Sequence, residues 1–406
     1  MEKYKTKAAI DIGTSKIVVV VGVQREENGK IEIIGVGEAP SFGIKAGVIN
    51  NIEEATSSIS GAIEAAERMS GVSIHSAFVS VGGPHIHSVI SKGMIAIPKE
   101  KNEITDDDID RVIEDSKSIS LPSNSELLHV IPKEFIVDGQ RGIKDPRGMT
   151  GSRLEVETVL IYASTPALNN LGKCLFQAGI DIDGYIAAPL AAAWGVLQPR
   201  QKDLGVAVVD IGARCTSVAI FEEESLLHCE VLPIGAAHIT NDIAIGLRTS
   251  IDVAEKVKIQ YGAAIAEEVS EREKIILSKI DPKEEGEVSR KYVVEIIEAR
   301  LSEIFSMIRK EIKKVKKDKL LPAGVVLTGG GAKLPGMVEL SKRELELPSQ
   351  VGFPKPSGGI IDKLDDPSYC VSIGDLIWGF EKKSKEKIIS FPFSDKIKKF
   401  LKSFLP

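Results

Sequence analysis

Residues 205–221, GVAVVDIGARCTSVAIF, decide how this 406-residue chain folds. An apolar run leads to Asp210-Ile211-Gly212, a short polar turn follows, and a second run rich in β-branched residues completes the stretch. β-Branched side chains favour strands, and glycine permits the tight turn between them. The stretch therefore predicts a hairpin whose first strand ends in a carboxylate.

A second copy of this design lies near the N-terminus. Residues 8–22 read AAIDIGTSKIVVVVG and place Asp11-Ile12-Gly13 at the corresponding turn. Small residues at such turns let backbone N–H groups approach an anion. Two matching hairpins about 200 residues apart therefore predict a duplicated α/β fold in which two turns face each other and handle phosphate.

Composition places the chain among soluble globular proteins. A length of 406 residues predicts two or three domains, and 43% hydrophobic with 27% charged residues is ordinary for that class. The net charge of −6 argues against nucleic acid as a partner. No apolar run reaches the ~18 residues of a membrane span. The N-terminus leads almost directly into a strand without a signal peptide, so we expect the body of the protein in the cytoplasm.

Cysteine and histidine spacing gives no metal motif. The four cysteines form no CxxC pair and are expected to be buried thiols. His85 and His87 would share one face of a strand, but no third ligand is near them in the sequence. We interpret these two histidines as a surface-facing pair.

The pattern of strands, helices and glycine-rich turns divides the chain into two lobes with one insertion. The helical part of the second lobe is expected to contain one long helix, residues 288–320, with Ser289 as its N-cap. The expected bounds are 1–84 and 158–196 for the first lobe, 85–157 for an inserted αβ subdomain, 197–237 and 321–380 for the core of the second lobe, 238–320 for its helical subdomain, 381–392 for a charged linker, and 393–406 for an amphipathic helix.

The two turns and a later glycine triplet together predict a nucleotide cleft. Asp11 and Asp210 end their strands and are expected to hold Mg²⁺ through water, because Mg²⁺ gives up its water ligands reluctantly. The triplet lets the backbone approach a planar base, and two residues one helical turn apart, Glu255 and Lys258, could hold ribose hydroxyls. The expected nucleotide-binding residues are Asp11, Gly13, Thr14, Ser15, Lys16, Asp210, Gly212, Ala213, Arg214, Glu255, Lys258, Gly329, Gly330, Gly331 and Lys333.

The last residues predict a short basic amphipathic helix. Eight lysines against three acids in residues 381–406 give a net charge of +5, which leaves −11 for the rest of the chain. A basic helix with bulky apolar residues is typical of segments that lie in the interface of an anionic membrane. A helix packed onto its own domain is the alternative. The apolar face is Phe393, Ile397, Phe400, Leu401, Phe404 and Leu405, and the lysines between them are Lys396, Lys398, Lys399 and Lys402.

Further motifs extend along essentially the whole chain. They are VSVGGPHI at 79–86, HVIPKE at 129–134, VDGQ at 137–140, Asp145-Pro146 with Gly148-Met149, GAAHITNDIA at 235–244 and AEKVK at 254–258. On these motifs the sequence resembles the FtsA family of bacterial cell-division actin homologues, within the actin/Hsp70/sugar-kinase superfamily.

The resemblance implies a duplicated actin-like (ribonuclease H-like) two-lobed fold, with the family's inserted subdomain near residues 85–157. It also implies that the protein binds ATP, polymerises with itself, and tethers the FtsZ ring to the inner membrane. Such a protein would act with other divisome proteins, as a peripheral protein on the cytoplasmic side of the membrane at the division septum.

One motif departs from the family's pattern. Where the family usually reads Asp-Ile-Gly-Gly-Gly-Thr-Thr, this chain has Ala213, Arg214 and Cys215 after Gly212. Arg214 either points at the phosphates and neutralises their charge or points away and crowds the turn. No residue stands out as a base that would activate water. We therefore expect nucleotide binding with at most a weak ATPase activity.

Other functions of the same superfamily stay open at this stage. A small-molecule kinase or phosphatase would need a substrate pocket with a catalytic carboxylate, and it would have no use for a basic amphipathic tail. A pilus-assembly actin homologue would share the insertion type but reach the membrane through a partner. An Hsp70-like chaperone would need more chain beyond the nucleotide domain. The tail favours the cell-division function.

Overall fold

The structure, a computed structural model, describes residues 4–25, 29–98, 103–355, 358–360 and 364–381. Its first lobe is built on the N-terminal hairpin, in which β1 (Tyr4–Ile12) pairs antiparallel with β2 (Lys16–Arg25). On one side β3 (Ile31–Pro40) extends the meander, and on the other β6 (Ser76–Val81) and β11 (Asp181–Ala187) add parallel strands. With the short β19 (Gly358–Gly359), the strand order is β11-β6-β1-β2-β3-β19.

The second lobe repeats this order around the second hairpin. Five of its strands run in the order β18-β17-β12-β13-β14, which matches β11-β6-β1-β2-β3 of the first sheet strand by strand. In both sheets the hairpin strands are antiparallel, and the first two strands of the order run parallel to the first strand of the hairpin. The structure thus confirms the duplicated α/β fold. These strands are β12 (Val206–Ile211), β13 (Thr216–Glu222), β14 (Ser225–Leu232), β17 (Val325–Thr328) and β18 (Ser349–Val351).

Helices cover both faces of the first sheet, which explains why β2 contains four consecutive valines, residues 18–21. Val19 and Val21 pack in the same cluster as the apolar face of α1 (Ile52–Ser70). Val18 and Val20 point the other way, toward α10 (Cys370–Glu381). A strand buried on both faces has no polar side to present, so alternation disappears.

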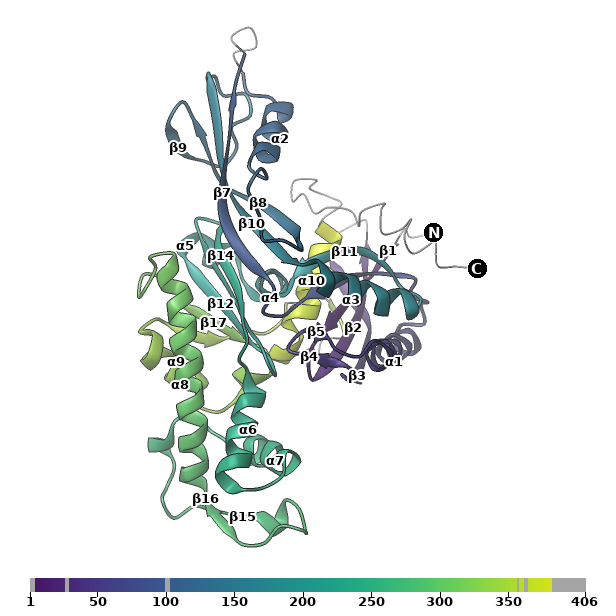
Figure 1. The fold of residues 1–406 in the computed structure, drawn as a ribbon, viewed down its shortest axis with the longest axis vertical. Helices are drawn as coiled ribbons and strands as arrows, with labels where there is room; N and C mark the ends of the chain where they lie inside the picture. Colours follow the sequence, from purple (N-terminus) through teal and green to yellow (C-terminus); the bar gives the residue numbers. More distant parts are fainter. Residues whose placement is uncertain (1–3, 26–28, 99–102, 356–357, 361–363, 382–406) are drawn as a thin grey trace.

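The second sheet continues into the inserted subdomain. β14 is bridged to β7 (His87–Ala96) at the pair Glu230 and His87, and the sheet then runs on as β7-β10-β8-β9. The expected boundary between residues 157 and 158 falls inside β10. Figure 1 shows this subdomain projecting from the two lobes as one long extension. Its other elements are α2 (Asp106–Asp115), β8 (Ser125–Val137), β9 (Gln140–Ile143) and β10 (Arg153–Ser164).

The long helix is shorter than the sequence predicts. We expected 288–320, whereas α8 covers Arg290–Lys314, with Ser289 as its N-cap accepting from the backbone N–H of Tyr292. Two later residues, Lys316 and Lys319, adopt positive φ, and Arg309 on the helix holds Asp318 at 2.9 Å. The chain is thereby folded back onto the helix instead of prolonging it.

Two helices cross between the lobes with their backbones in contact. α4 (Ala188–Val196) follows β11 of the first sheet and leads through α5 (Pro199–Leu204) to β12 of the second. A Cβ on Gly195 would lie 2.0 Å from the carbonyl oxygen of Cys370, and one on Gly374 would lie 1.8 Å from that of Ala191. Only glycine fits at these two positions, so the small residues of α4 serve a close approach to α10.

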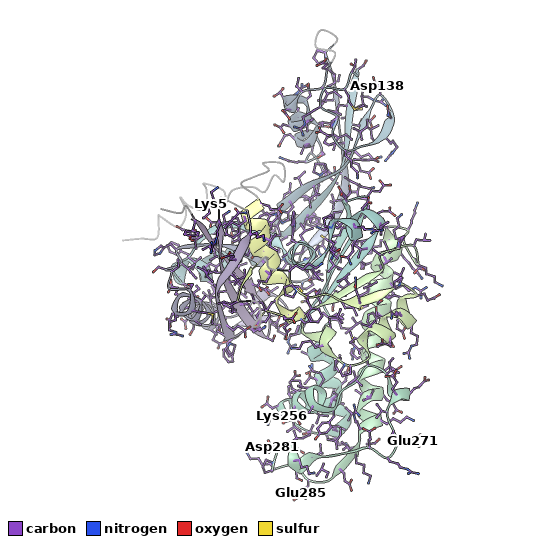
Figure 2. The ribbon with its side chains drawn as sticks, turned by 180° about the vertical axis from the view of Figure 1, so that it is seen from behind. Lys5, Asp138, Lys256, Glu271, Asp281 and Glu285 are labelled. Atoms are coloured by element: carbon purple, nitrogen blue, oxygen red, sulfur yellow. The ribbon has the colours of Figure 1, made fainter. Side chains whose placement is uncertain are left out.

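The remaining helices and short strands fill the outer parts. Among the described residues, no helix is both long and apolar enough to cross a bilayer. Figure 2 shows the two ends of the elongated molecule, with Asp138 at the inserted subdomain and Asp281 and Glu285 at the opposite end. The remaining elements are α3 (Thr165–Gln177), α6 (Ala236–Leu247), α7 (Ile251–Tyr261), α9 (Met337–Leu345), β4 (Ile44–Lys45), β5 (Val48–Ile49), β15 (Lys274–Ile276), β16 (Glu287–Ser289), and the 3₁₀ turns Ala266–Glu268, Leu277–Lys279, Gly330–Lys333 and Pro367–Tyr369.

Candidate functional site

The two predicted turns occupy equivalent places in the two sheets. In the first, Ile12 pairs with Ile17 and leaves residues 13–15 as the turn, and in the second residues 212–215 form the turn after β12. A Cβ on Gly13 would lie 2.7 Å from the carbonyl oxygen of Lys16, so this turn requires glycine. The second turn is closed by Gly212, whose N–H donates to the Cys215 carbonyl at 2.9 Å.

Each strand-end aspartate accepts a hydrogen bond from a hydroxyl on the neighbouring parallel strand. Ser80 Oγ donates to Asp11 at 2.8 Å, and Thr328 Oγ1 donates to Asp210 at 3.1 Å. In both sheets the donor is the register partner of the aspartate. Sequence reasoning missed these two hydroxyls, although each closely precedes a run of glycines.

The two carboxylates influence each other electrostatically. Burial, and then the negative charge of Asp11, raise the pKa of Asp210 to about 7, against the hydrogen bond from Thr328. Burial also raises the pKa of Asp11, although Ser80 and Lys16 oppose that rise. The effect of one charge on the other requires proximity. The fold therefore brings the carboxylates of Asp11 and Asp210 together from strands about 200 residues apart.

A third carboxyl group lies beside this pair. Asp375 is fully buried in α10, and burial followed by the charge of Asp11 raises its pKa well above the ordinary value. Sequence reasoning did not select it. The signal was available, because Asp375 is the one acid in the apolar stretch CVSIGDLIWGF.

The glycine triplet packs against the second turn. Gly329 has φ +82°, and a Cβ there would lie 2.6 Å from the Ile211 carbonyl oxygen and 2.7 Å from Asp210 Oδ1. A Cβ on Gly331 would lie 2.5 Å from Ile211 Cγ2, whereas one on Gly330 would meet nothing within 4 Å. Two glycines thus allow close packing, and the middle one borders open space.

The predicted ribose-binding residues, Glu255 and Lys258, contact α6, and α6 in turn contacts the second turn. Lys258 is buried, and its Nζ lies 2.7 Å from Glu255, 2.9 Å from Thr240 Oγ1 and 3.3 Å from the Ala236 carbonyl. The N–H of Ala236 in turn donates to the Gly212 carbonyl at 2.9 Å. Lys258 is therefore held by protein groups, while Glu255, at 43% side-chain exposure, stays accessible.

The two other predicted lysines lie at the rim of the two turns. Lys16 pairs with Glu38 at 2.9 Å and lies over the ring of Tyr369 at 4.1 Å. Lys333 pairs with Asp366 at 2.5 Å. Both cations have carboxylate partners in this structure, which an anion could replace.

The other turn residues are placed as follows. Thr14 Oγ1 accepts from the N–H of Gly47 at 3.3 Å, and Ser15 is exposed. The Ala213 carbonyl accepts from the Ala237 N–H at 2.7 Å. Within the described residues Arg214 forms no salt bridge. Burial, and then the negative charge of Asp210, raise the pKa of the Cys215 thiol to about 11. The positive charge of Arg214 opposes this rise.

The residues present fit a nucleotide with a divalent cation. Backbone N–H groups at two glycine turns are suited to phosphate. Two convergent carboxylates, Asp11 and Asp210, are the oxygen donors that Mg²⁺ takes. The open face at Gly330 leaves room for a flat group.

The repeated sheet order, the paired aspartate turns and the insertion within the first lobe define an actin-like fold. Two solved structures share this fold: a chain of the PilM-PilN type IV pilus biogenesis complex has a TM-score of 0.66 at 17% identity, covering 92% of this chain and 98% of that one. MreB5 of Spiroplasma citri bound to ADP has a TM-score of 0.54 at 14% identity, covering 98% of each chain.

Within this class, two family models and two similar proteins show that the chain belongs to the FtsA family of cell-division proteins. A family model described as cell division protein FtsA matches residues 207–374, and one described as the SHS2 domain inserted in FtsA matches residues 83–162. Cell division protein FtsA of Pseudomonas aeruginosa PAO1 is 38% identical over 384 residues, which is 95% of this chain and 91% of that protein. The protein of the same name from Bacillus subtilis 168 is 39% identical, over 92% of this chain and 83% of its own length.

Proposed function

We propose that this chain is an ATP-binding, actin-like protein that polymerises and tethers the FtsZ ring to the cytoplasmic membrane at the division septum. The observation that carries the nucleotide part is the pair Asp11 and Asp210, whose charges act on each other between two glycine turns. Membership in the FtsA family supports the cell-division part.

In this proposal the cleft holds the nucleotide by backbone and side-chain groups of both lobes. Mg²⁺, when bound, supplies positive charge that offsets both the phosphates and the two aspartates, which hold it through water. The turn after Asp11 and the turn after Asp210 donate backbone N–H groups to the phosphates. Glu255 and Lys258 serve the ribose, and the glycine triplet lies against the base.

Closure of the lobes follows from this arrangement. Without a cation, two buried carboxylates close to each other repel, which favours separation of the lobes. Neutralising them favours approach, and the approach changes the outer surfaces that meet the next subunit of a filament. Nucleotide binding would thereby control self-assembly.

Hydrolysis is proposed to be weak or absent. The second turn carries Ala213 and Arg214 in place of two glycines and Cys215 in place of a threonine of the family pattern, and no residue stands out as a base that would activate water. We propose that bound ATP acts mainly as a structural ligand.

Membrane attachment is assigned to residues 393–406, which lie outside the described residues, as do residues 382–392 of the expected linker. The six apolar residues and four lysines of that segment would lie in the interface with anionic lipids. One short helix binds weakly, and a filament would present many such helices at once. Partners in this proposal are FtsZ, other divisome proteins and further copies of the chain, on the cytoplasmic side.

Calorimetry with Mg-ATP tests the nucleotide part. We expect one ATP per chain, with binding lost in D11N and kept in D203N, a matched change on the short exposed helix α5. Absence of heat with the parent chain would refute nucleotide binding.

Co-sedimentation with anionic liposomes tests the membrane part. The intact chain should sediment, and a chain truncated before Phe391 should stay in solution. Equal sedimentation of both would refute a membrane role for the tail.

A small-molecule kinase is not favoured, because the relatives matched over nearly the whole chain are cell-division proteins.

A further inference from the structure

Four metal-ligating side chains from three elements share one face of the second sheet. His228 and Glu230 are two residues apart on β14, so both point to the same side of the sheet. His87 on β7 is the register partner of Glu230 and lies on that side as well. The helix α8 brings Glu311 to the same place.

Their ligand atoms lie close enough to surround one ion. One ligand atom each from His228, Glu230 and Glu311 lies within 4.8 Å of the others. His87 Nδ1 lies 2.6 Å from Glu230 Oε1, at the outer edge of this group of three. With zinc–ligand bonds of about 2.0–2.2 Å, ligands around a tetrahedral ion stand roughly 3.3–3.5 Å apart. The three inner atoms would have to draw together, and His87 would have to turn further inward, for all four to bind one ion.

Hydrogen bonding fixes which nitrogen of His228 faces this group. Ser88 Oγ donates its one hydrogen to the Cys229 carbonyl at 2.7 Å and accepts from the Cys229 N–H at 3.0 Å. Its contact with His228 Nδ1, at 3.0 Å, must therefore be donated by the histidine. A metal-binding histidine is usually oriented in this way by a hydrogen bond from its other nitrogen.

The other nitrogen, Nε2, then faces a carboxylate. It lies 2.8 Å from Glu311 Oε2, and Glu311 also accepts from Lys314 Nζ at 2.6 Å, which favours its ionised form. A nitrogen lone pair and a carboxylate oxygen at this distance would repel, so the contact favours a cation between them. A proton satisfies this requirement, and so does a divalent metal.

We propose that His228, Glu230, Glu311 and His87 form a binding site for a divalent transition metal, Zn²⁺ by ligand chemistry. Two imidazoles and two carboxylates suit zinc, whereas Mg²⁺ prefers oxygen alone. Zn²⁺ would displace the proton between His228 and Glu311. His228, Glu311 and Glu230 have side-chain exposures of 12%, 8% and 15%, so they are largely shielded, and His87, at 42%, provides the entry side.

Such an ion would join three parts of the molecule. β7 belongs to the inserted subdomain, β14 to the core of the second lobe, and α8 to its helical part. β14 and β7 are joined by one register pair, Glu230 with His87. A metal at this place would therefore set the rigidity of the subdomain's attachment.

Titration of the full, metal-stripped chain with Co²⁺ and Zn²⁺ tests the proposal. We expect one ion per chain, with the visible absorption of four-coordinate Co²⁺, and an affinity reduced at least about tenfold in H228Q and E311Q. H87Q, at the exposed ligand, leaves the buried part intact and should also weaken binding. Two matched controls should bind the metal like the parent. They are E303Q, which changes another glutamate of α8, and H75Q, which changes an exposed histidine.

Thermal unfolding of the same proteins separates lost binding from lost folding. Zn²⁺ should raise the unfolding midpoint of the parent and of both controls, and should not raise that of H87Q by the same amount. Absence of stoichiometric binding by the parent would overturn the proposal. Metal affinity equal to the parent's in H87Q and also in H228Q or E311Q would overturn it as well. A thiolate charge-transfer band would do the same, because it would place the metal at a cysteine.

Discussion

Replacement of Gly329 by alanine should damage both the fold and the cleft. The residue has φ +82° and ψ 171°, a region open essentially to glycine alone, which costs an alanine about 1–3 kcal/mol. The new Cβ would also lie 2.6 Å from the Ile211 carbonyl and 2.7 Å from Asp210 Oδ1, and such overpacking adds about 1–3 kcal/mol. We expect a total loss of about 3 kcal/mol or more, which for 406 residues unfolding as one unit corresponds to a fall in the thermal midpoint of roughly 3–4 °C.

The neighbouring glycine provides the matched control. A Cβ on Gly330 would meet nothing within 4 Å, so G330A should keep the parent's midpoint within about 1 °C or so. If the nucleotide lies on this face, G330A should nevertheless weaken ATP binding. Scanning calorimetry gives the midpoints, and fluorescence titration with a labelled ATP gives the affinities. A G329A protein as stable as the parent and binding ATP equally well would refute the packing argument.

Three further predictions concern the cleft and the tail. In metal-free protein the raised pKa of Asp210, about 7, means that the folded state binds this proton more tightly than the unfolded chain, so stability should fall as pH rises from about 4 to about 7, by up to about 4 kcal/mol. The pKa values of Asp11 and Asp375 are raised as well, so D210N should reduce that slope in urea unfolding without abolishing it, and an identical slope in both proteins would contradict the assignment. R214Q should lower ATP affinity about tenfold while leaving AMP affinity unchanged, measured by calorimetry, and equal ATP affinity would mean that Arg214 points away from the phosphates. The double change F400E and F404E should release the chain from anionic liposomes without altering ATP binding, and sedimentation like that of the parent would contradict the interfacial helix.

Local signals in the sequence predicted the elements that frame the site. Such signals mark both ends of α1, where Asn51 accepts from two backbone N–H groups and Gly71 closes the helix in the left-handed conformation. The hairpin predicted at residues 205–221 is β12 with β13. Caps, turn glycines and β-branched runs act within a few residues, so they can be read from the chain directly.

Contacts between distant segments could not be predicted in this way. The bridge between Glu230 and His87 joins residues 143 positions apart, and no local pattern specifies that β7 adds to the second sheet. The hydroxyl partners of the two aspartates and the buried Asp375 depend on the same kind of long-range packing. α8 ended early because Arg309 binds Asp318, an ion pair that competes with the helical propensity of the lysine-rich segment between them.

The contact of α4 with α10 restricts the motion that nucleotide could cause. Each backbone lies against a glycine of the other, so the helices cannot slide past each other without a steric clash. The contact therefore opposes shear at this crossing, and we expect relative movement of the lobes to be a hinge rotation centred there. Displacement is smallest at the axis of a rotation. Because α10 ends at Glu381 and leads into the proposed membrane segment, the lobes could open and close while the point of attachment stays nearly stationary.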